Sequence, residues 1–238
     1  MLKKIFTVER LSRFILLSLI VSVVFICIRI GLAPSDTLGG EEGVRVKSDY
    51  VLMLLQCIVG VIAMLLPGML KVRSGIIIPS GMMGAYAVFL YCAIFLGEVQ
   101  SFYYAVPHWD TVLHMFSGGM LGTVGFSVIT LLNKTERIPF ILSPIFVAVF
   151  ALCFAMSLGV VWEIYEYVAD CILGTNMQKF MLESGELLIG QAALADTMKD
   201  LIVDTIGALV VSMVGYGSLK YETGWLEQIR IKVETKPD

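Results

Sequence analysis

Long apolar runs dominate the sequence, and charged residues fall mainly between them. A helix that crosses a bilayer needs about 20 mostly apolar residues; four uncharged windows reach that length, and two further apolar segments are interrupted by charged residues. Since backbone polar groups in lipid need internal partners, the pattern predicts an all-α, polytopic membrane protein with a six-helix transmembrane bundle. The expected helices cover residues 14–33, 50–70, 75–97, 110–132, 139–168 and 196–219.

Composition narrows the class of protein. The chain has 238 residues, of which 58% are hydrophobic and 16% charged, against about 45–50% and about 25% in soluble domains. A soluble protein is therefore excluded, and the high apolar fraction also excludes a disordered chain. The net charge of −3 leaves no basic face for nucleic acid. We expect a single transmembrane domain with a polar cytoplasmic tail at 220–238.

Lys and Arg in loops mark the cytoplasmic side of a membrane protein. With the N-terminus in the cytoplasm, most of the 17 Lys and Arg residues fall in cytoplasmic segments. We therefore expect a multi-pass inner-membrane protein with both termini in the cytoplasm. A secretory signal is the alternative for the first segment, but Arg29 within it and Pro34 after it favour an uncleaved helix.

Other segments are less informative. The five cysteines show no CxxC or zinc spacing, so we interpret them as membrane hydrophobes without a disulfide. The aromatic segment 98–109 is typical of a membrane interface. The longest outer loop, 171–195, has room for a short amphipathic or re-entrant helix.

Ionisable residues gather at the non-cytoplasmic ends of the last three helices, and such groups inside a span are costly unless they serve a function. Spacings of three or four residues place the members of each group on one helical face. The groups are Asp110 and His114, then Glu163 and Glu166, then Asp196, Asp200 and Asp204. The sequence predicts one acidic pocket with a histidine, open to the side away from the cytoplasm.

Several carboxylates with one imidazole form a donor set for a divalent metal ion, with Mg²⁺, Mn²⁺, Fe²⁺ and Zn²⁺ as candidates. A carboxylate not used as a ligand, either Asp204 or Glu166, would serve as general base. Arg29 and Lys199 lie near enough in the predicted topology to hold a substrate anion. The expected ligands are Asp110, His114, Glu163, Glu166, Asp196 and Asp200.

Structural roles compete with these assignments. Asp110 and Asp196 each stand where a helix N-cap is expected. His114 could instead form an interhelical hydrogen bond. Glu166 and Asp170 could instead face water at the end of their helix. Small residues such as Gly118 and Gly207 indicate close helix packing.

Three motifs also carry a family resemblance. They are Trp109-Asp110-Thr-Val-Leu-His114, Trp162-Glu163-Ile-Tyr-Glu166 and Asp196-Thr-Met-Lys-Asp200, which continues through Asp204-Thr-Ile-Gly207. In these residues the chain resembles the YjdF-like family of bacterial inner-membrane proteins, and it is more distantly similar to the VanZ-like proteins. The resemblance covers about half of the chain and implies that the motifs form one functional unit; it names no reaction.

Three functions fit the sequence. The first is a metal-dependent hydrolase or transferase that acts on a lipid or lipid-linked headgroup at the outer leaflet, with membrane lipid as its partner. The second is a transporter of metal ions or protons, although no charged residue continues the path below Asp204 and His114. The third is a metal-stabilised scaffold or sensor without catalysis. The oligomeric state stays open.

Overall fold

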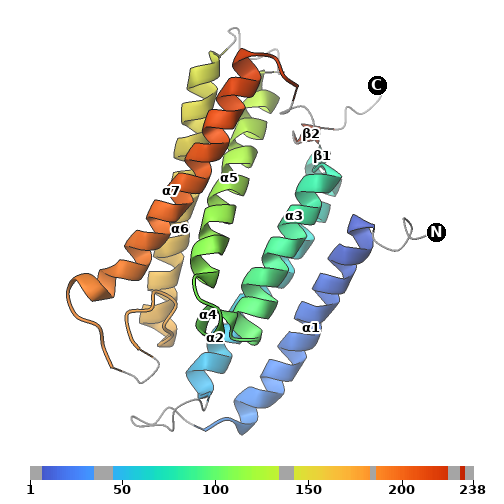
Figure 1. Cartoon of the computed structure of the whole chain (residues 1–238). Helices are drawn as coiled ribbons and strands as arrows, with labels where there is room; N and C mark the ends of the chain where they lie inside the picture. Colours follow the sequence, from blue (N-terminus) through green and yellow to red (C-terminus); the bar gives the residue numbers. More distant parts are fainter. Residues whose placement is uncertain (1–6, 35–44, 134–141, 183–185, 225–230, 234–238) are drawn as a thin grey trace.

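The chain folds into long helices that run up and down (Figure 1). The computed structural model describes residues 7–34, 45–133, 142–182, 186–224 and 231–233. Six of the described helices are long and apolar enough to cross a membrane, which confirms the all-α membrane fold. They are α1 (Val8–Leu32), α2 (Lys47–Ser74), α3 (Ser80–Leu90) continued by the π-helical η2 (Tyr91–Val99), α5 (Trp109–Asn133), α6 (Pro144–Leu173) and α7 (Gln191–Lys220). A short helix, α4 (Phe102–Ala105), precedes α5.

The helices form two groups of three, α1–α2–α3/η2 and α5–α6–α7, each with its own core (Figure 1). The first core is built around Ile15, Leu19, Ile26 and Cys57, and the second around Phe126 and Ala151. α1 begins and α7 ends at the same end of the bundle (Figure 1). The opposite end, where α5 and α7 begin and α6 ends, is called the acidic end below.

The third span begins later than expected. Gly75 adopts a left-handed conformation with φ 65° and ends α2, a conformation that glycine takes without steric cost. Ile76–Ile77 then form strand β1, which pairs antiparallel with β2 (Lys232–Val233). The helix predicted from residue 75 therefore starts at Ser80, and part of the expected polar tail folds back onto the bundle. Next to β2, the Ile231 N–H donates to Ser127 Oγ on α5 at 3.3 Å.

The last two helices are displaced from their expected bounds. α6 begins at Pro144 instead of 139, because Ser143 caps it and proline is pre-organised for the first helical position; residues 139–141 lie outside the described residues. α7 begins five residues before 196, with Gly190 at its N-cap, so the N-cap alternative for Asp196 is wrong. The helix expected within 171–195 is absent from the described residues between α6 and α7, where Met181 and Leu187 form an isolated bridge.

α5 and α7 approach closely at two glycines. A Cβ on Gly118 would collide with the backbone of Asp204, and one on Gly207 would collide with the Met115 carbonyl. The close packing predicted from these small residues is therefore confirmed. Because the backbones touch here, the Asp204 side chain lies directly against α5.

Candidate metal site

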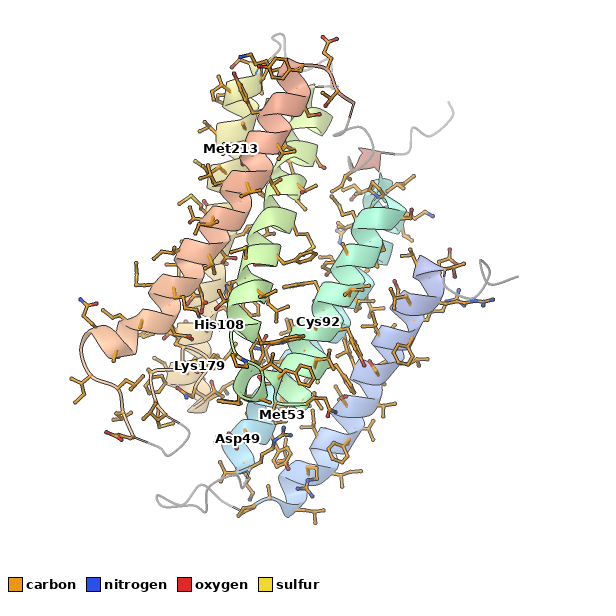
Figure 2. All side chains as sticks on the ribbon, in the orientation of Figure 1. Asp49, Met53, Cys92, His108, Lys179 and Met213 are labelled. Carbon is orange, nitrogen blue, oxygen red and sulfur yellow. The ribbon has the colours of Figure 1, made fainter. Side chains whose placement is uncertain are left out.

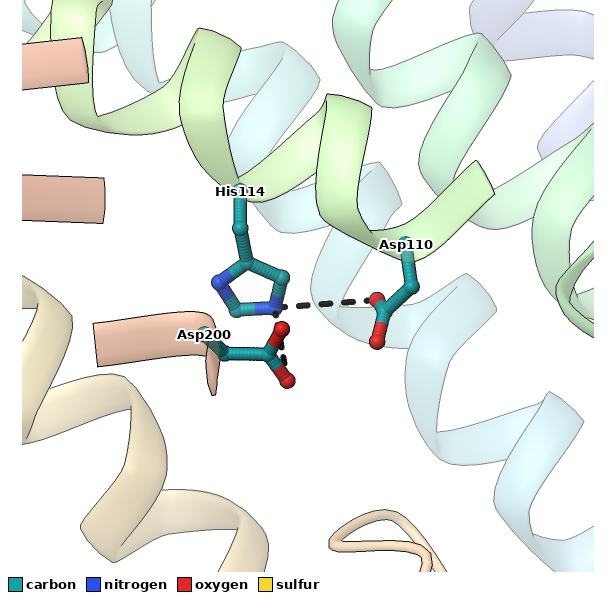
Figure 3. Close-up of side chains that lie close together, drawn as sticks. All are labelled: Asp110, His114 and Asp200. Atoms are coloured by element: carbon teal, nitrogen blue, oxygen red, sulfur yellow. Dashed lines mark ion pairs between the residues drawn. The ribbon is translucent and has the colours of Figure 1, made fainter. Parts of the chain in front are cut away.

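The imidazole of His114 stands at the centre of the acidic end. His114 Nε2 lies 3.6 Å from Asp110 Oδ1, one turn earlier on α5, and 3.9 Å from Asp200 Oδ2 on α7 (Figure 3). On the other side of the ring, His114 Nδ1 lies 3.2 Å from Asp204 Oδ2. One helix supplies the ring and a carboxylate, and the other supplies two carboxylates four residues apart.

Asp110, His114 and Asp200 can act as ligands to one ion. Each offers one ligand atom, and these atoms all lie within 4.8 Å of one another. Figure 3 shows the two carboxylates converging on the same edge of the imidazole. Asp200 is 1% exposed, and its Oδ1 has no hydrogen-bond partner among the described residues. A buried carboxylate oxygen without a partner is costly, and a cation would remove that cost.

Asp204 contacts His114 at Nδ1, the ring nitrogen that faces away from Asp110 and Asp200. Its Oδ2 faces His114 Nδ1, and its Oδ1 accepts a hydrogen bond of 2.7 Å from Ser117 Oγ. A carboxylate on the second ring nitrogen fixes the orientation and tautomer of a metal-binding histidine. The interhelical hydrogen bond weighed as an alternative for His114 is thus present, and it leaves Nε2 facing Asp110 and Asp200. Ser117 was missed in the sequence, although its seven-residue spacing from Asp110 continues the same helical stripe.

Two glutamates of α6, Glu163 and Glu166, complete the acidic cluster beside the residues of α5 and α7. Glu163 is 5% exposed, and neither carboxylate oxygen has a partner at ordinary hydrogen-bond geometry in the described chain, although the Thr197 hydroxyl lies near. Glu166 is also buried, and its Oε1 accepts a hydrogen bond of 2.9 Å from Trp162 Nε1, so it does not simply face water. Both carboxylates lie close enough to His114 to interact electrostatically.

The remaining predicted site residues differ in their placement. Asp196 is half-buried at the mouth of the cluster, and Lys199 is exposed beside it. Arg29 lies elsewhere, in the first helix group. Its guanidinium donates to the Tyr50 hydroxyl at 2.9 and 3.1 Å and lies 5.4 Å from the centre of that ring. The structure therefore does not bring Arg29 to the acidic cluster.

Sequence reasoning missed two residues at the mouth, Lys179 and Tyr103. Lys179, between α6 and α7 (Figure 2), places Nζ 5.3 Å from the centre of the Tyr103 ring on α4. Burial lowers the pKa of Lys179, but Asp110 and Asp196 more than reverse this and raise it above its usual range, so the ammonium stays charged. Burial and nearby carboxylates raise the pKa of Tyr103 well above its usual range, which keeps the phenol neutral.

Asp170 organises the loop that carries Lys179. Its Oδ1 accepts hydrogen bonds from Thr175 Oγ1 at 2.6 Å and from the Met177 N–H at 2.7 Å, and its Oδ2 accepts one from the Gln178 N–H at 3.0 Å. Asp170 is therefore buried and hydrogen-bonded at both oxygens, and the alternative in which it faces water is wrong. Its role is to fix the loop over the cluster.

A family model described as "Predicted membrane protein (DUF2238)" matches residues 13–221. The chain belongs to this family. The matched region contains all three acidic motifs and Lys179. A protein of Thermotoga maritima, described as uncharacterized, is 28% identical over 133 residues, which is 55% of this chain and 58% of that protein. The chain thus spans less than two thirds of the length of that relative. No solved structure matches the chain.

This DUF2238 protein also has an apolar groove of about 590 Å³ between its two helix groups, lined by α3, α5 and α7. On α5 the groove uses Val112, Phe116 and Gly119. At 100° per residue these positions lie on the face opposite Asp110 and His114. The groove is therefore separate from the acidic cluster, and the metal-ligating chemistry lies only on the α6 side of α5 among the described residues.

Proposed function

We propose that this protein binds a divalent metal ion between Asp110, His114 and Asp200 and uses it on a lipid or lipid-linked headgroup at the outer leaflet. The observation that carries the proposal is the convergence of one imidazole nitrogen and two carboxylate oxygens within 4.8 Å. Asp200 adds a buried oxygen without a partner in the described chain. The donor set suits Mg²⁺, Mn²⁺, Fe²⁺ or Zn²⁺. Glu163, which interacts electrostatically with His114, is the candidate for a further ligand, whereas Asp196 lies outside the group of three converging ligand atoms.

The surrounding residues support a metal-dependent hydrolase or transferase. A divalent ion would polarise a phosphoryl or carbonyl oxygen of the headgroup. Asp204 has both oxygens engaged, by His114 and Ser117, so its proposed role is to position the imidazole. Glu166, held at one oxygen by Trp162, is the better candidate for the general base expected from the sequence.

The location of the site is part of the same proposal. The distribution of Lys and Arg favours cytoplasmic termini in an inner membrane, and this orientation puts the acidic end at the outer leaflet, where headgroups are within reach. Kinship with the YjdF-like proteins, and more distantly with the VanZ-like proteins, also belongs to the proposal and rests on the three motifs.

The geometry favours an enzyme over a transporter. α5 and α7 touch through Gly118 and Gly207 at the level of Asp204. Beyond His114 and Asp204, toward the other end of the bundle, the described parts of α5, α6 and α7 carry no charged residue before Lys220. A continuous ionic path therefore lacks support, while a site that opens at one side suits a reaction on a headgroup.

His114→Gln tests the metal site. Loss of the imidazole ligand should weaken Mn²⁺ binding at least about tenfold, since even partners of metal ligands contribute about 10–100-fold. Electron paramagnetic resonance can follow Mn²⁺ titrations of detergent-purified protein, and elemental analysis should find about one divalent ion per wild-type chain. The matched control is His108→Gln, at an exposed histidine just before α5, which should bind Mn²⁺ normally. Wild-type protein without metal after chelator-free purification would contradict the proposal, and His114-dependent ion flux in proteoliposomes would favour transport.

A further inference from the structure

The loop between α6 and α7 places one cation over the carboxylates. Lys179 Nζ donates to the Met177 carbonyl at 3.2 Å and lies over the Tyr103 ring. Asp110, Asp196 and Glu166 are close enough to interact with it electrostatically. Among the ion pairs within 4.0 Å in the described chain, however, Lys179 takes part in none. The ammonium nitrogen therefore lies more than 4.0 Å from these carboxylate oxygens.

The loop is built to hold this position. Asp170 accepts three hydrogen bonds from the loop. Gln178 Nε2 donates to Thr197 Oγ1 on α7 at 3.1 Å, and Asn176 exchanges hydrogen bonds of 2.6 and 3.1 Å with the Met181 backbone. Lys179 itself has a positive φ of 49°, which non-glycine residues adopt only when their surroundings hold them there. A loop tied at both sides presents the ammonium with little entropy left to lose on binding.

The charge of Lys179 limits which ligand group can bind beside it. Beside a divalent ion bound by Asp110, His114 and Asp200, a second cation would be repelled, whereas an anionic group can contact both the ion and the ammonium. A tetrahedral phosphate has oxygens enough to contact a metal ion on one side and an ammonium on the other, the arrangement that stabilises phosphoryl groups in many enzymes. Two of the three ammonium donors remain after the Met177 bond.

We propose that Lys179 binds a phosphate group of the substrate, which is then held between this ammonium and the metal bound by Asp110, His114 and Asp200. The proposal rests on the proposed function and names its substrate class as phosphate-bearing. The phosphate belongs either to a lipid headgroup or to a free phosphate compound, and the experiment separates these sources. Tyr103, a neutral phenol beneath the ammonium, positions Lys179 through its ring.

Lys179→Gln tests the proposal in full-length protein in detergent. Mn²⁺-loaded protein is titrated with inorganic phosphate and, separately, with dioleoyl phosphatidic acid in mixed micelles; ³¹P line broadening by bound Mn²⁺ reports the phosphate close to the metal. The variant should bind phosphate at least about tenfold more weakly, since hydrogen bonds to charged groups have roughly that effect. Mn²⁺ affinity should stay equal or rise, because a neighbouring positive charge is removed.

Matched variants separate binding from loop structure. Lys220→Gln removes the same charge from a lysine that also lies over a tyrosine ring, at the opposite end of α7, and should change phosphate affinity less than twofold. Lys179→Arg keeps the charge and should recover a measurable part of the affinity. Lys179-dependent binding of both ligands identifies the phosphate group alone as the determinant, and binding of phosphatidic acid alone identifies a lipid headgroup.

Equal phosphate affinity in wild type and Lys179→Gln, with Mn²⁺ binding intact, would overturn the proposal. Calorimetry without Mn²⁺ measures the Lys179-dependent affinity even if the chain binds no metal. The two proposals can therefore fail separately. If the metal site is wrong, wild-type protein does not bind Mn²⁺. If the Lys179 site is wrong, wild-type protein and Lys179→Gln bind phosphate with equal affinity.

Discussion

Asp200→Asn should abolish tight divalent-metal binding and make the metal-free protein more stable. Asp200 is 1% exposed, and one of its oxygens has no hydrogen-bond partner in the described chain. A buried charge lowers stability unless a cation compensates it, so the neutral amide relieves a cost in the metal-free state. The same change removes an anionic ligand. We expect the metal affinity to fall more than about 100-fold, because mutating residues that only hydrogen-bond to metal ligands already lowers metal affinity about 10–100-fold.

Thermal unfolding with and without Mn²⁺ measures both effects. Saturation at 100 times the dissociation constant stabilises a wild-type protein by about 2.7 kcal/mol, and Asp200→Asn should lose this metal-dependent gain while its metal-free Tm rises. Asp196→Asn is the control on the same helix, since Asp196 is half-buried at the mouth and outside the group of three converging ligand atoms. It should keep most of the metal response. A lower metal-free Tm in Asp200→Asn would show that Asp200 stabilises the fold without a cation.

The acidic cluster could be predicted because its members lie on regular helices. Asp110 and His114 share a face at any position of the helix bounds, and so do Asp200 and Asp204. An error of several residues at the start of α7 therefore left the stripe intact. The up-and-down order of the spans then brought the motifs to one end, since consecutive membrane helices alternate in direction.

The other parts of the site depend on an irregular loop and on which helices are neighbours, and neither follows from a periodic residue spacing. Lys179 reaches the cluster because Asp170 binds the loop backbone at Met177 and Gln178, and no residue spacing encodes such a path. Arg29 was misplaced for a related reason. Hydropathy locates a residue at a depth in the membrane but does not tell which helices are neighbours, and α1 packs in the other helix group.

Gly207→Ala should destabilise the α5–α6–α7 group more than any polar change considered above. The smallest possible side chain would already collide with the Met115 carbonyl, and a backbone atom cannot rotate away. Overpacking with flexible neighbours costs about 1–3 kcal/mol; because α7 must move as a unit here, we expect about 3 kcal/mol, or a Tm lower by about 6–12 °C for a chain of this size.

Gly217→Ala is the matched control, because it lies on the same helix with nothing within 4 Å of its added Cβ. It should leave the Tm unchanged or raise it, since alanine is the better helix former by about 1 kcal/mol. The site should respond to Gly207→Ala as well: displacement of α7 lengthens the 3.2 Å contact between His114 and Asp204, so Mn²⁺ affinity should fall together with stability. If Gly207→Ala and Gly217→Ala share one Tm and one Mn²⁺ affinity, the close α5–α7 contact is not what holds the histidine in place.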